Sequence, residues 1–138
     1  MNLFLDANVI ISVLNREYPV FSYSSRVLSL ADKPGFKLYT SPVCFAIAFY
    51  FSEKKSGTKM AREKLSILAK KLHFTTINQH TVEQVIQNKK INDLEDGLQY
   101  YSALTSNCKY IVTEDRNDFY YSDIQVLNSC DFLKTCVF

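Results

Sequence analysis

Residues 2–6, NLFLD, are the stretch of sequence that points most directly to the fold. They form a short apolar run that ends abruptly on an acid, Asp6, as a buried strand does where it enters a polar loop. Four more short apolar runs follow along the chain. We expect each of these to be a strand as well: residues 37–41, 72–77, 109–113 and 124–127.

The segments between the expected strands have the spacing of helices. Apolar side chains in residues 20–31 recur every three or four positions. Residues 42–53 begin with Pro42, which suits a first helical turn, and residues 93–106 begin with acids, which the helix dipole favours there. Because strands alternate with helices, we predict an α/β fold with a mostly parallel sheet covered on both faces. Two further helices are expected over residues 58–71 and 80–88.

The composition indicates one ordinary globular domain, which we expect to span residues 1–138. A chain of 138 residues, 47% of them hydrophobic, is long enough to bury a core without disulfides or metals. Three Gly and three Pro exclude a low-complexity chain. No run of about 20 apolar residues predicts a membrane span, no signal-peptide pattern is present, and the four cysteines form no CxxC pair. We therefore expect a cytoplasmic protein with no membrane partner.

Acidic residues gather where a parallel sheet would bind a ligand, which is beyond the carboxyl ends of its strands. Asp6 ends the first strand, and Asp115 and Asp118 follow the fourth. Asp93 and Asp96 begin the helix that leads into the fourth strand, three positions apart and so on one face. If the first and fourth strands are neighbours, Asp6, Asp96 and Asp115 converge. Oxygen-only clusters of this kind bind Mg²⁺ or Mn²⁺, which suits metal-assisted phosphodiester hydrolysis.

Each of these acids also has a purely structural interpretation. Asp6 could cap a helix that begins near Val9, although Asn8 is the more natural cap there. Asp93 has the position of an N-cap, and Glu95 that of a solvated or capping-box side chain. Asp115 and Asp118 could be loop or turn residues.

Four segments, in order along nearly the whole chain, resemble a known family. They are LDANVIISVL, SPVCFAIAFYF, DLEDGLQYYSAL and YIVTEDRNDF, and together they resemble the PIN domain, the nuclease fold of many prokaryotic toxin–antitoxin toxins. The resemblance implies a single three-layer α/β/α sandwich with a parallel sheet of about five strands. It also implies an endoribonuclease that depends on Mg²⁺ or Mn²⁺, with RNA as its substrate.

The resemblance assigns roles to individual residues. The first, third and fourth acids of the family fall on Asp6, Asp96 and Asp115, which are thereby expected to be catalytic and to bind the metal. The family pattern also tolerates neighbouring acids as ligands, and Asp93 and Asp118 fall at such positions. Asn8 and Thr113 match small polar positions near the metal.

One position departs from the family pattern. PIN nucleases usually carry a Glu in the helix that follows Ser-Pro, and here that position is Ile47. Losing one of four acids weakens a two-metal site more than a one-metal site. The sequence therefore leaves two functions open: a PIN-type ribonuclease, or a catalytically weakened PIN-like domain that binds RNA or a protein.

The net charge of +2 divides into two opposed groups. The acids lie around Asp6, whereas residues 54–71 are rich in Lys and Arg, which could hold an RNA backbone or form a solvated helix face. For a toxin we expect an antitoxin that lays an amphipathic segment across the acidic cleft and inserts an Arg or Lys. A homodimer is the common expectation for so small a chain. The basic residues assigned to RNA binding are Lys54, Lys55, Lys59 and Arg62.

Other families that begin with an apolar strand and an acid fit less well. A haloacid-dehalogenase-type phosphatase needs a second Asp two positions after the first, where this chain has Asn8. A response-regulator receiver needs an early acidic pair, which is absent. A phosphate-binding glycine motif is excluded because the glycines are dispersed at positions 35, 57 and 97.

Overall fold

Five parallel strands form the central sheet in residues 1–137, the part of the chain that the computed structural model describes. They are β1 (Asn2–Leu5), β2 (Lys37–Thr40), β3 (His73–Phe74), β4 (Tyr110–Val112) and β5 (Gln125–Leu127). Their order across the sheet is β3-β2-β1-β4-β5. The predicted parallel sheet is thus confirmed. Phe138, the last residue of the expected domain, lies outside the described residues.

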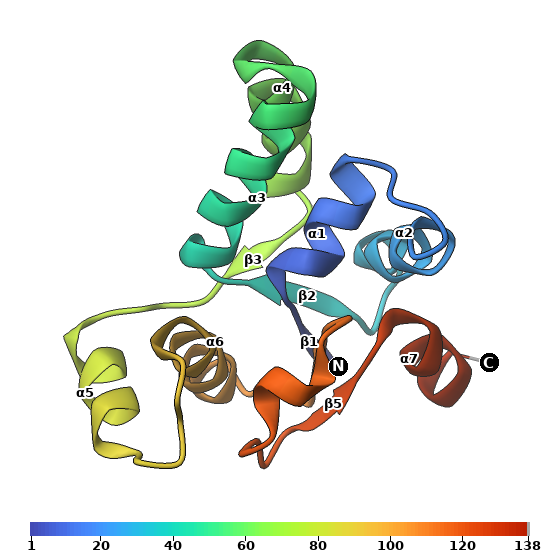
Figure 1. The fold of residues 1–138 in the computed structure, drawn as a ribbon. Coiled ribbons are helices and arrows are strands. Elements are labelled where there is room, and N and C mark those ends of the chain that lie inside the picture. Colours follow the sequence, from blue (N-terminus) through green and yellow to red (C-terminus); the bar gives the residue numbers. More distant parts are fainter. Residues whose placement is uncertain (138) are drawn as a thin grey trace.

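Helices cover both faces of this sheet (Figure 1). One face carries α1 (Ala7–Leu14), α2 (Phe21–Ser29), the short helix η1 (Leu30–Asp32) and α7 (Ser129–Cys136), and the other carries α5 (Gln79–Gln87) and α6 (Leu94–Thr105). The helices α3 (Pro42–Ser56) and α4 (Thr58–Ala69) pack side by side and project away from the sheet. A short helix η2 (Arg116–Phe119) follows β4. No helix of the described chain is both long and apolar enough to cross a membrane.

Alternation along the strands builds one core on each face of the sheet. Leu3 and Leu5 of β1 and Val112 of β4 belong to the cluster beneath α1, α2 and α7. Phe4 and Ile111, which alternate with them, belong to the cluster on the α6 side. All five side chains are buried, because the period of a strand is two residues and both of its faces meet helices.

The central position of β1 decides where a ligand site lies. Its register with β4 pairs Leu5 with Val112, so the residues that follow, Asp6 and Thr113, come out at the same edge. The Asp6 amide continues the ladder by donating to the Val112 carbonyl at 3.0 Å. After β1 the chain continues to β2, which pairs on one side of β1, whereas β4 pairs on its other side. The strand order therefore reverses at β1, and α/β sheets bind ligands in the crevice that such a reversal opens.

The projecting helix pair has clear end signals. Ser41 caps α3 by accepting a hydrogen bond from the Cys44 amide at 2.9 Å, and Pro42 occupies the first helical turn, as predicted. Gly57 separates α3 from α4 with φ of +84° and ψ of 162°, a conformation that is essentially restricted to glycine. The chain therefore reverses direction at Gly57, and α4 returns along α3.

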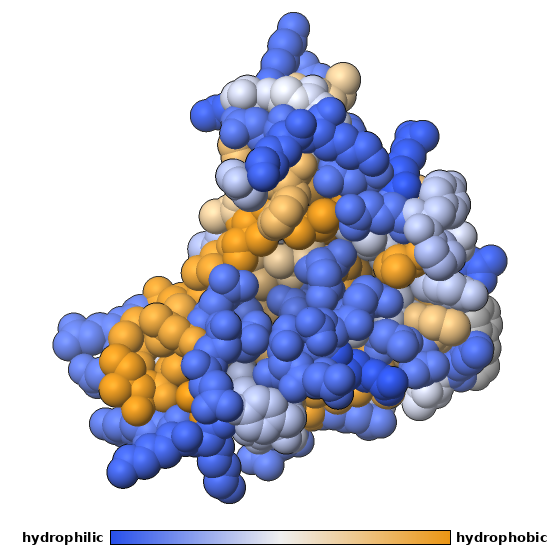
Figure 2. All heavy atoms as spheres, viewed as in Figure 1, coloured by the Kyte–Doolittle hydropathy of each residue, from blue (hydrophilic) through white to orange (hydrophobic). Residues whose placement is uncertain are grey.

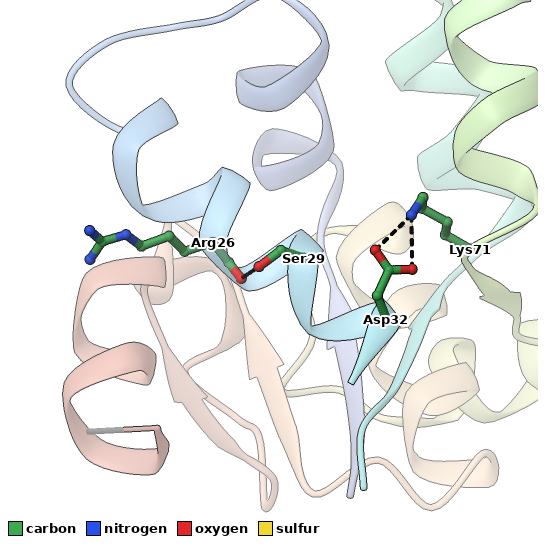
Figure 3. A network of polar contacts seen from close by, with 4 residues as sticks. All are labelled: Arg26, Ser29, Asp32 and Lys71. Atoms are coloured by element: carbon green, nitrogen blue, oxygen red, sulfur yellow. Dashed lines mark hydrogen bonds and ion pairs between the residues drawn. The ribbon is translucent and has the colours of Figure 1, made fainter. Parts of the chain in front are cut away.

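A polar network on the surface joins η1 to the end of α4 (Figure 3). Lys71 and Asp32 form an ion pair at 2.8 Å, and Ser29 donates to the Arg26 carbonyl at 2.6 Å one turn earlier. Both charged side chains are substantially exposed, so the pair contributes at most about 1 kcal/mol. Lys71 lies in the basic segment that the sequence offers to RNA, but here it is engaged within the protein.

Three details differ from the sequence-based expectations. The first helix begins at Ala7 with Asp6 as its N-cap, so the preference for Asn8 as the cap was wrong. The strand expected over residues 72–77 is reduced to two residues, His73–Phe74. Helix α7 was not predicted, because it is only eight residues long and its N-cap, Asn128, does not follow a strong strand pattern.

The contact between α5 and α6 depends on Gly97. A Cβ at this position would lie 2.5 Å from Cγ1 of the buried, β-branched Val85. We expect Gly97→Ala to lower the free energy of unfolding by roughly 1 kcal/mol, because overpacking (about 1–3 kcal/mol) exceeds the gain in helix propensity (about 1 kcal/mol). Urea denaturation measures the change. The second substitution Val85→Ala should make Gly97→Ala less damaging; additive losses would contradict a direct clash.

Candidate active site

The carboxylate of Asp6 lies at the end of β1 and is held from three sides. Its Oδ2 accepts a hydrogen bond from the Thr113 hydroxyl at 2.9 Å, and its Oδ1 accepts one from the Ala7 amide at 2.9 Å. The Cys44 thiol of α3 lies 3.6 Å from Oδ1. With 8% of its surface exposed, Asp6 is buried. Burial is the main reason that its pKa is raised, and the carboxylate of Asp115 raises it further.

Thr113 connects the strand ends to the loop that follows β4. Its buried hydroxyl donates to Asp6 and accepts from Asn8 Nδ2 at 3.0 Å and from the Asp115 amide at 3.1 Å. Asn8 Oδ1 in turn accepts from the Glu114 amide at 3.1 Å. Asn8 and Thr113 therefore lie beside Asp6, and they join it to the loop that carries Asp115.

The beginning of α6 brings two predicted acids to the same place. Asp93 is the N-cap of this helix, and its Oδ1 accepts from the Asp96 amide at 3.1 Å. Asp96 lies in the first turn and is half-buried. Its pKa is raised to about 7, first by burial and then by the carboxylates of Asp93, Asp118 and Asp6. Asp93 thus has the structural role considered for it and also adds charge to the group.

The remaining predicted acids come from the loop after β4. Asp115 precedes η2 and is exposed, and Asp118 lies within η2, where its amide donates to the Asp115 carbonyl at 3.2 Å. The pKa of Asp118 is raised by burial and then by Asp115, with smaller effects of Asp6 and Asp93. We call Asp6, Asp93, Asp96, Asp115 and Asp118 the acidic cluster.

Glu95 lies beside this site at the beginning of α6. It was interpreted as a solvated or capping-box side chain; it is exposed, as a solvated side chain is, and no capping box forms at α6. The pKa of Glu95 is raised by burial and then by Asp93, Asp6 and Asp118, so its carboxylate lies within electrostatic reach of the acidic cluster. The signal was present in DLED, which places three acids within four positions at the amino end of a helix.

The acidic cluster has the chemistry of a cation site. Both ion pairs in residues 1–137 involve other acids, so no basic side chain neutralises the cluster there. Within the same residues, no three His, Cys, Asp or Glu side chains lie close enough together to hold a metal ion between them. Mg²⁺ usually binds through one or two carboxylates and keeps several waters. The cluster therefore fits a hydrated divalent cation better than a fully protein-ligated one.

The third helix contributes no acid to this edge. Ile47 of α3 is half-buried and packs against the apolar cluster that contains Phe4 and Tyr100. Figure 2 shows apolar surface over the part of α3 nearest the sheet and over α5. The negative charge at the site therefore comes from β1, the loop after β4 and the beginning of α6.

The basic residues assigned to RNA lie on the projecting pair of α3 and α4, whose connecting turn is far from the sheet (Figure 1). Lys55 donates to the Asn15 carbonyl at the end of α1, so it has a structural partner. Lys54 lies 4.8 Å from the centre of the Tyr50 ring. Lys59 and Arg62 are exposed on α4. The structure thus separates this basic surface from the acidic cluster.

An open apolar groove of about 720 Å³ lies between α3 and α4. Its walls are aromatic and aliphatic, and one basic side chain stands at its rim. The residues that line it include Phe45, Phe49, Leu65, Phe74 and Arg62.

Comparison with known proteins agrees with this architecture. A family model described as PIN domain matches residues 2–117. Ribonuclease VapC1 of Aquifex aeolicus (strain VF5) is 29% identical over 137 residues, which cover 94% of this chain and 92% of that protein.

Two solved structures share the fold at low sequence identity. VapBC2 from Rickettsia felis, bound to a DNA fragment from their promoter, superposes with a TM-score of 0.70 at 18% identity and covers 93% of this chain and 98% of that chain. VapC20 of Mycobacterium tuberculosis, a sarcin–ricin loop cleaving toxin, gives a TM-score of 0.63 at 13% identity over 79% of this chain and 86% of that one. These likenesses confirm the predicted α/β fold.

The raised pKa of Asp96 predicts a pH dependence of stability. Between about pH 4 and pH 7 the folded state keeps a proton that the unfolded state has lost, so the free energy of unfolding falls as the pH rises through this window. We expect Asp96→Asn to remove this loss and, at about pH 8, to stabilise the metal-free protein by about 1 kcal/mol, after allowance for partial exposure.

Urea denaturation in chelator at about pH 5 and about pH 8 tests this. Glu63→Gln, on the exposed side of α4, is the matched control and should leave the pH dependence unchanged. An Asp96→Asn protein that loses as much stability as the wild type over this range would contradict the prediction.

Proposed function

This chain belongs to the PIN domain family, and from that premise we propose that it is a divalent-metal-dependent endoribonuclease and the toxin of a toxin–antitoxin pair. The observation that carries the proposal is the acidic cluster. Its acids come from distant parts of the sequence and share one edge of the sheet: Asp6 follows β1, Asp96 lies at the start of α6, and Asp115 lies in the loop after β4. The similarity to ribonuclease VapC1 supports the reaction, and the fold shared with VapBC2 supports the biological role.

The chain's own residues would divide the work as follows. Asp6, Asp96 and Asp115 provide the carboxylate oxygens for Mg²⁺ or Mn²⁺, with Asp93 and Asp118 as further acids beside them. The hydrogen bonds of Thr113 and Asn8 fix the orientation of this set.

When bound, the cation neutralises charge on the scissile phosphate and activates a water molecule. Burial and the neighbouring carboxylates raise the pKa of Asp96 to about 7, so this carboxyl exchanges its proton near neutral pH and would release it in order to hold a cation.

The site has one carboxylate fewer than the family pattern provides, because Ile47 stands in α3 where the family usually has its second acid. We propose that Glu95 of α6 supplies part of the missing negative charge. Its electrostatic coupling to Asp6 supports this role. A single hydrated cation then suits the site better than two, since two adjacent cations need more carboxylates to neutralise them.

We assign the RNA backbone to the exposed basic surface of α3 and α4. Lys54, Lys59 and Arg62 present charge there, whereas Lys55 is partly used by the end of α1. Contacts of this kind bind phosphates without reading the base sequence.

We also propose a protein antitoxin as partner. The acidic cluster would accept an Arg or Lys from it, because a charge-assisted hydrogen bond to a carboxylate replaces the absent basic neighbour. An amphipathic segment of the antitoxin has apolar surface to pack against in the groove between α3 and α4. We also propose that the chain forms a homodimer, since two-fold dimers are the commonest small assemblies.

Metal-dependent RNA cleavage is the decisive experiment. With Mn²⁺, the wild-type protein should cleave single-stranded RNA, and Asp6→Asn should lower kcat by at least about a hundredfold, because a buried ligand carboxylate is lost. Glu63→Gln is the control for the loss of one carboxylate far from the site. Cleavage that persists in Asp6→Asn or in excess chelator would contradict the assignment. A wild-type protein that binds RNA without cleaving it would favour the binding-module function.

The basic surface gives a second prediction, on the salt dependence of RNA binding. The double variant Lys59→Ala, Arg62→Ala should weaken binding and reduce the slope of log K against log salt by about 1.4, since each phosphate contact on a single strand contributes about 0.7. Fluorescence anisotropy with a labelled RNA at several salt concentrations measures this slope.

The matched control for that experiment is Lys33→Ala, Lys37→Ala, which removes two exposed lysines, one directly after η1 and one at the first residue of β2. It should leave the slope unchanged. Equal slopes for both double variants would show that the protein attracts RNA only through its total charge.

A further inference from the structure

Glu114 is the acid of the site loop that does not point into the acidic cluster. It stands between Thr113 and Asp115, yet its Oε2 accepts a hydrogen bond from the Ser129 hydroxyl at 2.7 Å and another from the Ser129 amide at 3.0 Å. Ser129 is the first residue of α7 and is fully buried. The side chain of Glu114 therefore joins the loop after β4 to the beginning of the last helix.

The physical basis of this contact is the start of a helix. The Ser129 amide is one of the first N–H groups of α7, which have no acceptor within the helix. A carboxylate satisfies that group and is also favoured by the helix dipole, and hydrogen bonds to a charged acceptor are stronger than neutral ones. Glu114 thus has partners within the protein that need no cation.

The opposite side of the same loop is held by the site itself. The Glu114 amide donates to Asn8 Oδ1 at 3.1 Å, and the Asp115 amide donates to the Thr113 hydroxyl at 3.1 Å. One residue further on, Arg116 pairs with Asp131 of α7 at 3.5 Å, but both side chains are exposed and the pair is weak. The Glu114 side chain is therefore the principal side-chain anchor between this loop and α7 within the described residues.

We propose that Glu114 is a positioning residue that keeps Asp115 beside Asp6 by anchoring the site loop to α7. The inference rests on the proposed function, since it concerns how the loop presents a metal ligand. It assigns to α7, the helix that the sequence pattern did not reveal, a role in holding the site. Residues that orient ligands in this way typically change metal affinity or activity about 10- to 100-fold when they are replaced.

Hydrogen–deuterium exchange of the metal-free protein tests the anchor directly. In Glu114→Ala, the amides of residues 114–118 should exchange about tenfold faster, while those of α4 keep their wild-type rates. Mn²⁺ affinity, followed by the paramagnetic resonance signal of free Mn²⁺ without RNA, should weaken about tenfold or more. In cleavage assays kcat should fall, while KM for RNA stays close to the wild-type value.

Glu114→Gln separates position from charge, because its amide oxygen can still accept from Ser129 although the negative charge is gone. It should restore slow exchange and bring Mn²⁺ affinity to within about threefold of the wild type. Glu63→Ala, an exposed charge loss on α4, should match the wild type throughout. If Glu114→Ala does not fold, Ser129→Ala replaces it in these measurements. This variant removes only the hydroxyl donor, and it should give smaller changes of amide exchange and Mn²⁺ affinity in the same direction.

The proposal is overturned if exchange of residues 114–118 is unchanged, or if it accelerates while Mn²⁺ affinity and kcat stay at wild-type values. Equal losses of Mn²⁺ affinity in Glu114→Gln and Glu114→Ala would also overturn it, because charge alone would then explain the effect. Failure of the proposed function gives a different result: the wild-type protein itself would neither bind Mn²⁺ nor cleave RNA.

Discussion

The hydrogen bond from the Thr113 hydroxyl to the Asp6 carboxylate is the interaction on which the rest of the site depends. It joins the ends of β1 and β4, two strands that are more than a hundred residues apart in sequence and adjacent in the sheet. The same hydroxyl accepts from Asn8 and from the Asp115 amide, so one buried oxygen orients both strand-end acids. This arrangement requires the register that pairs Leu5 with Val112, since a shift of one residue would turn Thr113 toward the opposite face.

Crowding of carboxylates is the energetic consequence of that arrangement. Burial and mutual repulsion raise the pKa of Asp6, Asp96 and Asp118, and each shift measures a preference of the folded state for the neutral acid. A protein selected for stability alone would place bases or amides here. The apolar cores on both faces of the sheet, built on side chains such as Leu3 and Phe4, stabilise the fold enough to tolerate the repulsion.

Much of this fold could be predicted because its elements carry local signals. The apolar run of β1 that ends on Asp6, and Pro42 at the start of α3, depend only on residues close in sequence. Asp6 was considered as a helix cap, but Asn8 was preferred, and the side chain of Asp6 in fact serves two purposes, capping α1 and joining the acidic cluster. Glu114 shows a further limit of local signals. The side-chain direction of Glu114 depends on Ser129, a contact that no local pattern contains.

The basic residues show why composition alone could not locate the functional surface. Lys55 and Lys64 donate to the backbone carbonyls of Asn15 and Leu14, at the carboxyl end of α1, where the helix dipole favours positive charge. These two lysines therefore fix the projecting helices against the sheet layer, whereas Lys59 remains exposed. A near-neutral chain thus places opposite charges at opposite ends of α1, acids at its beginning and lysines at its end. The dipole of α1 favours both placements, so the charge separation that suits a metal-dependent nuclease also stabilises the helix between the two surfaces.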